Sequence, residues 1–153
     1  MLQILLWTML KKNIELLEIN ELNILLLSPH TDDAELGCGG SIFKLLEKGH
    51  HLNWMVFSTA EESLPDGLEK NTLRKEFENV IDLLNIKYDD CSIFNFKVRE
   101  LAKSRQQILD ALITARKNYS PDLVICPSLN DFHQDHQVLS NEAVRAFKTT
   151  SSI

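Results

Sequence analysis

Two short segments of the chain concentrate side chains that bind metals or move protons. Residues 29–35 read PHTDDAE and residues 133–136 read HQDH. His30 and Asp33, three residues apart, can turn an imidazole nitrogen and a carboxylate oxygen toward one cation, which leaves Asp32 free to act as a base. Catalytic zinc takes three nitrogen or oxygen ligands from the protein and keeps a fourth position for water. The first segment therefore predicts two ligands and a base of a metal-dependent hydrolase.

The second segment offers the third ligand. His133 and His136 both lie in a loop that enters a predicted helix, so either can bind the metal while the other serves as a general acid. His50 and His51 stand at the start of a predicted strand, away from the edge where parallel sheets place their sites, and we expect them to be structural or solvated.

A structural explanation competes with the functional one for both segments. Helix N-termini favour carboxylates, and a capping role would account for either Asp32 or Asp33, or for Asn130 or Asp131 near the second segment. Capping does not account for both carboxylates together with His30. Since both segments fall on the same edge of the predicted sheet, we favour the functional interpretation.

The elements that position these segments alternate between strand and helix. Short apolar runs predict buried strands, and apolar stripes at helical spacing predict the helices between them. We expect strands at 22–28, 51–58, 92–96 and 123–126, and helices at 34–48, 68–84, 104–119 and from 134 or 136 to 147. This order predicts an α/β fold, a Rossmann-like three-layer sandwich with a mostly parallel sheet. Each chemical segment then follows a strand, where such folds bind ligands.

Bulk properties fit one ordered domain. The chain has 153 residues, 44% of them hydrophobic, with a net charge of -6, which argues against a nucleic-acid partner. The cysteines, Cys38, Cys91 and Cys126, are odd in number and form no CxxC pair, so we expect buried thiols and a cytoplasmic location. The apolar stretch at residues 1–10 is too short to span a membrane. We expect residues 1–21 to be an N-terminal extension or packing helix, with the domain at 22–153.

Over residues 22–148 the two segments resemble the LmbE-like, PIG-L type superfamily of zinc-dependent de-N-acetylases, including Gly37, Gly39 and Gly40 after the first motif. That resemblance implies His30, Asp33 and His136 as metal ligands, Asp32 as general base, His133 as the group that assists the oxyanion or the leaving amine, and Asp135 as the carboxylate that orients His133. It also implies that the chain removes acetyl groups from N-acetylglucosamine-type sugars, with Zn²⁺, or another divalent ion such as Fe²⁺, as cofactor.

Two departures from the family pattern stand out. Thr31 replaces the usual proline, and the family domain usually continues well past the second motif, so we expect a C-terminally shortened domain. The alternative function is therefore a weakly active or inactive metal- or nucleotide-binding fragment, and the shortened sheet and apolar N-terminus favour a homo-oligomer. As weaker candidates for contacts to a small carbohydrate substrate, we name Arg74, Arg99 and Arg105.

Overall fold

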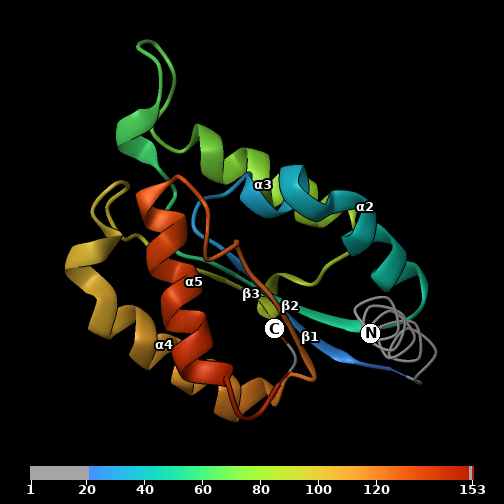
Figure 1. Ribbon diagram of the computed structural model, residues 1–153. Coiled ribbons are helices and arrows are strands. Elements are labelled where there is room, and N and C mark those ends of the chain that lie inside the picture. The colour runs from blue at the N-terminus through green and yellow to red at the C-terminus, as the bar shows by residue number, and fades with distance from the viewer. Residues whose placement is uncertain (1–20, 152) are drawn as a thin grey trace, which may run out of the picture.

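The computed structural model describes residues 21–151 and 153, so the predicted N-terminal extension lies, apart from Glu21, outside the described residues. Strands and helices alternate along the chain (Figure 1). They are β1 (Asn23–Ser28), α2 (Asp33–Glu47), β2 (His51–Val56), α3 (Thr72–Leu83), β3 (Cys91–Ile93), α4 (Arg105–Tyr119), β4 (Leu123–Ile125) and α5 (Gln134–Phe147). Short 3-10 turns lie at η1 (Glu61–Ser63), η2 (Tyr88–Asp90) and η3 (Leu101–Ser104).

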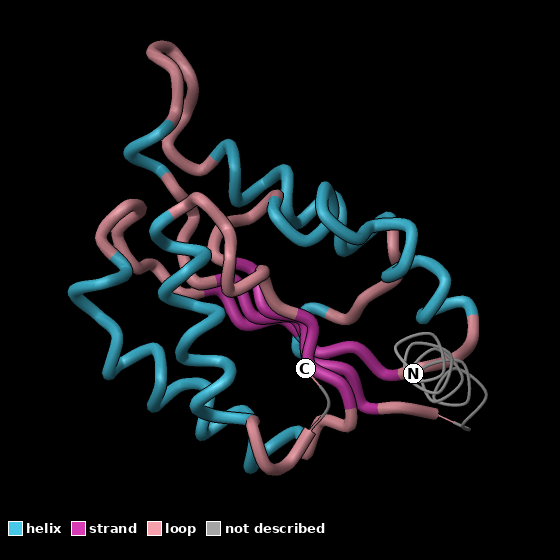
Figure 2. The backbone as a smooth tube through the Cα atoms, viewed as in Figure 1, coloured by secondary structure: helices cyan, strands magenta, loops and turns pink. Residues whose placement is uncertain are grey.

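The strands form one parallel sheet in the order β3-β2-β1-β4. Helices α2 and α3 cover one face, and α4 and α5 cover the other (Figures 1 and 2). The predicted α/β fold with helices on both faces of a parallel sheet is confirmed. Such burial on both faces explains why β1 is a continuous apolar run rather than an alternating one.

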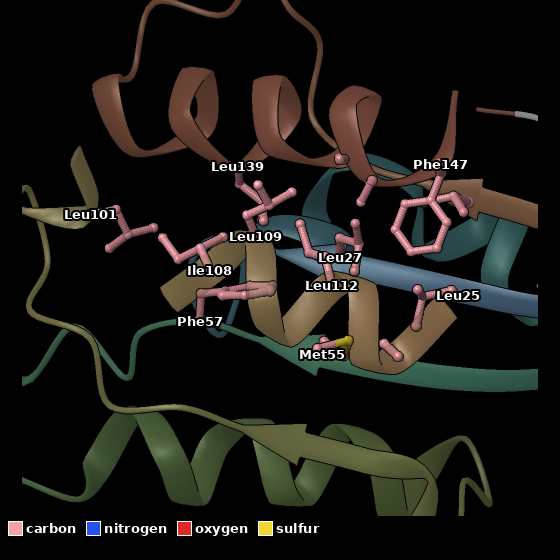
Figure 3. Close-up of a cluster of buried hydrophobic side chains, with 14 residues drawn as sticks. Leu25, Leu27, Met55, Phe57, Leu101, Ile108, Leu109, Leu112, Leu139 and Phe147 are labelled. Carbon is pink, nitrogen blue, oxygen red and sulfur yellow. The ribbon is translucent and has the colours of Figure 1, made fainter. Parts of the chain in front are cut away.

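Successive side chains of the strands point to opposite faces of the sheet and belong to two separate hydrophobic cores. Leu25 and Leu27 of β1 point to the α4 and α5 side, where they pack against Leu112, Leu139 and Phe147 (Figure 3). Ile24 and Leu26 point to the opposite side, where the core also holds Trp54, Ile42 and Phe77. The sheet is therefore packed against a hydrophobic core on both faces, and these cores hold in place the strand ends from which the loops begin.

Successive strands of the chain are added to opposite sides of β1, although all strands remain parallel. The chain passes from β1 to β2 and β3 on one side and then crosses to β4 on the other side of β1. The carboxyl ends of β1 and β4 are thus neighbours, paired in register from Ile24–Leu123 to Leu26–Ile125. In open α/β sheets a reversal of this kind opens the crevice in which ligands bind.

The structure differs from the sequence-based expectations in several places. Strand β2 ends at Val56 and not at residue 58, and β3 spans Cys91–Ile93 and not 92–96. Helix α3 begins at Thr72 and not at residue 68, because turns around Gly67, whose φ is 92°, occupy the preceding residues. Helix α2 is kinked at Cys38, where φ is -147°. The three free cysteines are only partly buried, so the prediction of buried thiols was wrong.

Within the residues that the structure describes, none of the helices combines the length and apolar character that crossing a membrane requires.

Candidate metal centre

The loop after β1 is held in place by an extension of the sheet pairing and by its own aspartate. The carbonyl oxygens of Ser28 and Pro29 accept hydrogen bonds from the backbone N–H groups of Phe57 (3.0 Å) and Ser58 (2.9 Å). The Asp33 carboxylate then accepts the backbone N–H of His30 at 2.8 Å. The buried strand and the first turn of α2 together fix the His30 ring beside Asp33.

The loop after β4 is organised around Asp131. Its Oδ1 accepts the backbone N–H of His133 at 2.8 Å, and its backbone carbonyl accepts the side-chain amide of Gln137 at 2.6 Å. His133 caps α5, because its Nδ1 accepts the backbone N–H of Asp135 at 3.2 Å. This arrangement aims both histidines of the second segment at the crevice beside β1.

Asp33 joins the two segments. Its Oδ2 lies 3.0 Å from Nδ1 of His30, and its Oδ1 lies 3.1 Å from Nε2 of His136. One ring nitrogen from each of His30, His133 and His136 lies within 4.8 Å of the others. Residues about a hundred positions apart therefore meet at one point.

Asp135 lies beneath this cluster and is 1% exposed. Its carboxylate accepts the backbone N–H groups of Arg99 (2.6 Å) and Leu101 (3.3 Å), and its Oδ2 lies 3.0 Å from Nε2 of His30. The sequence-based expectation was that the Asp135 carboxylate orients the ring of His133. The structure instead places His133 against the backbone N–H of Asp135 and places the carboxylate against His30.

Contacts within the cluster shift the pKa values of three of its side chains. Burial of the His30 ring opposes its protonation, but hydrogen bonds to Asp33 and Asp135 and their charges outweigh burial and raise its pKa. Burial likewise opposes ionisation of Asp33, yet its contacts with His30 and the nearby His136 lower its pKa. The pKa of His133 is lowered by burial and by the two neighbouring histidines, which keeps that ring neutral.

The remaining sequence-predicted residues fall into different settings. Asp32 is exposed at the N-cap position of α2 but makes no capping hydrogen bond with its side chain, so capping does not explain it. Arg99 lies at the cluster, because its backbone bonds to Asp135 and Gln134. Arg74 is engaged with Glu78 and Tyr88, and Arg105 with the buried Glu142, so both arginines already have partners within the protein.

One residue of the cluster was considered from sequence only as a helix cap. The Oδ2 of Asp131 lies 3.0 Å from Nδ1 of His136 and orients that ring. Its position two residues before His133, inside the same loop, is the feature of the sequence that could have indicated a role for Asp131 at the site. A carboxylate behind a histidine is the usual support of a metal ligand.

The donor set fits a zinc-like ion. Zinc binds imidazole nitrogen and carboxylate oxygen at about 2.0–2.2 Å in tetrahedral sites, which places neighbouring donor atoms roughly 3.3–3.5 Å apart. The contacts of 3.0 and 3.1 Å from Asp33 to His30 and His136 are close to that spacing. Small outward movements of the three side chains would accommodate the ion.

Comparison with known proteins gives consistent matches. The family model PIG-L, described as GlcNAc-PI de-N-acetylase, matches residues 25–147. The "Uncharacterized deacetylase YaiS" of Escherichia coli (strain K12) is 25% identical over 135 residues, which are 85% of this chain and 70% of that protein.

Two solved structures are also similar. The N,N'-diacetylchitobiose deacetylase from Pyrococcus horikoshii, solved with its inhibitor, is 27% identical with a TM-score of 0.69 over 86% of this chain and 54% of that one. The conserved protein TT1542 from Thermus thermophilus is 26% identical with a TM-score of 0.63 over 82% of this chain and 55% of that one. The chain thus spans about half the length of these two solved structures.

Proposed function

We propose that this chain, which belongs to the PIG-L family, carries the hydrolytic centre of a zinc-dependent de-N-acetylase that acts on N-acetylated sugars or sugar conjugates. The observation that carries the proposal is the bridging position of Asp33 between His30 and His136, at 3.0 and 3.1 Å. The 27% identity to a diacetylchitobiose deacetylase supports the substrate class.

We assign His30, Asp33 and His136 as the metal ligands because of the partners of their remaining atoms. Nδ1 of His136 faces the Asp131 carboxylate, so it carries the proton and leaves Nε2 available as a ligand. In the same way, Asp135 accepts the proton on Nε2 of His30 and leaves Nδ1 available beside Asp33. Zinc is the ion that best matches this donor set, and Fe²⁺ is the alternative.

His133 has the opposite arrangement and a different role. Its Nδ1 accepts the backbone N–H of Asp135, so in the neutral ring the proton sits on Nε2. A ring in that state donates a hydrogen bond and is a poor ligand through Nε2. His133 therefore stabilises the negative charge that develops on the amide oxygen.

Asp32 serves as the general base. An ion held by His30, Asp33 and His136 would supply Lewis acidity, which would polarise the amide carbonyl and make water more acidic. Asp32 takes the proton from the attacking water, the C–N bond breaks, and Asp32 passes that proton to the departing amine.

Amine release from N-acetylglucosamine derivatives tests this function, with Asp32→Asn as the diagnostic variant. Loss of a general base typically lowers a rate by about 10²–10⁴-fold, so we expect a loss in that range. Zinc content should stay at the wild-type value, because Asp32 is assigned as a base and not as a ligand.

The control is Asp66→Asn, which removes an exposed carboxylate from the loop before α3 and should leave the rate unchanged. Equal rates for wild type and Asp32→Asn would contradict the assignment of Asp32. Absence of amine release from the zinc-loaded wild-type chain would contradict the proposed activity.

A further inference from the structure

A cavity of about 320 Å³ borders the candidate metal centre. It lies between β1, β4 and the first turns of α2, at the point where the strand order reverses. Asp33 and His136 are part of its lining, so the cavity begins at the proposed ligands. Its size falls within the range of about 300–1,000 Å³ that is usual for ligand pockets.

Most of the cavity lining is apolar. Besides the ionisable side chains it consists of Leu26, Leu27, Ala34, Gly37, Cys38, Ile125, Cys126 and Pro127. Burial raises the pKa of the Cys38 and Cys126 thiols, so both are neutral at physiological pH.

The polar groups of the lining are already engaged with one another. They are Asp33, Asp131 and His136, whose side chains contact each other at 3.0–3.1 Å. A sugar ring placed here would lose its hydrogen bonds to water with few replacements, whereas a hydrocarbon chain would lose none.

We propose that this cavity receives the acyl group of the scissile amide and has room for a chain of about six to eight carbons. The proposal rests on the function proposed above and extends its substrate class from N-acetyl to medium-chain N-acyl sugars. An apolar cavity of about 150 Å³ in another protein holds benzene, with six carbons. The volume here is about 320 Å³, which exceeds the need of an acetyl group.

The reaction itself is unchanged by the longer chain. One water molecule supplies the oxygen of the new C–O bond, the C–N bond breaks, and the amine leaves with a proton. The products are a medium-chain carboxylate, whose chain occupies the cavity, and a free amino sugar.

Gly37 allows the cavity to be narrowed without disturbing the fold. It lines the cavity, and a Cβ added there meets no atom within 4 Å. Gly40 lies in the same helix with equally open space but does not line the cavity, so Gly40→Leu is a matched control. Leucine is a better helix former than glycine at both positions.

The experiment is calorimetric titration of the zinc-loaded chain with N-acetyl-, N-hexanoyl- and N-octanoylglucosamine. Asp32→Asn is present throughout to prevent hydrolysis, and the cavity is otherwise wild type or varied. A buried methylene adds up to about fourfold in affinity, so we expect wild type to bind the hexanoyl compound at least about tenfold more tightly than the acetyl one. Gly37→Leu should lower this ratio by about fivefold or more, and Gly40→Leu should keep it.

Affinity independent of chain length in wild type, or an equal loss of the ratio in Gly37→Leu and Gly40→Leu, would overturn the proposal. Amine release from the same compounds separates the two claims. Chain-length-dependent binding without release of amine would contradict the proposed activity and leave the acyl cavity standing. Release of amine without chain-length dependence of binding would support the proposed activity and contradict the acyl cavity.

Discussion

The ring nitrogens of the candidate centre are assigned by the carboxylates behind them. Asp131 lies behind His136 and Asp135 lies behind His30, each at 3.0 Å. Such supporting carboxylates fix the tautomer of a ligand and raise its basicity. The metal affinity of the centre should therefore depend on residues that do not touch the metal.

The variant Asp131→Asn tests this dependence. It keeps an oxygen that can accept the backbone N–H of His133 but removes the charge beside His136. We expect the dissociation constant for zinc to rise by about 10–100-fold. Competition titration against a zinc chelator measures the constant, and Asp110→Asn, in an exposed part of α4, is the control. Unchanged affinity in Asp131→Asn would remove Asp131 from the support of the centre.

Sequence could predict which residue types gather at the centre but not every contact among them. The spacing of His30 and Asp33 indicated a shared cation, and the structure brings them to 3.0 Å. The contact between His30 and Asp135 joins positions 105 residues apart. It depends on how α5 and the loop at Arg99 pack together, and no local pattern records that packing.

At the level of elements, Asp135 ties helix α5 to the loop that precedes η3. Arg99 in this loop has a φ of 64°, in the left-handed region that costs a residue with a side chain about 1–2 kcal/mol. The hydrogen bonds from Arg99 and Leu101 to Asp135 help to hold this conformation. Asp135 is thus a structural support of the fold as well as of His30.

The variant Asp135→Ala should lower the free energy of unfolding by about 2–4 kcal/mol, because it leaves two backbone N–H groups without their acceptor. Urea denaturation of chelator-treated protein measures this change without a contribution from metal. Asn141→Ala, at an exposed position of the same helix, should change stability by less than about 0.5 kcal/mol. A loss of similar size in both variants would contradict the structural role of Asp135.

Most elements could be predicted from sequence because their apolar patterns are strong. The run at Ile24–Leu27 and the stripe at Phe77 and Ile81 are buried in the structure as expected. The start of α3 and the kink at Cys38 could not be predicted. Both depend on local backbone conformations that the apolar pattern does not encode, the first of them at Gly67.

At the level of the whole molecule, the strand order β3-β2-β1-β4 assembles the centre. The alternation of strands and helices predicts a parallel sheet, but it does not say on which side of β1 the last strand lies. The pairing of β4 with β1 brings the loops at His30 and His136 to the same crevice. Both segments therefore meet within this chain, which spans about half the length of the similar solved structures.

Zinc titration of chelator-treated protein tests most directly whether the two segments form one metal centre. By calorimetry, the wild-type chain and Asp32→Asn should each bind one zinc ion per chain, because Asp32 is not assigned as a ligand. His136→Ala should lose this binding, since it removes the ligand that the second segment contributes. Absence of stoichiometric binding in wild type, or undiminished binding in His136→Ala, would contradict the account.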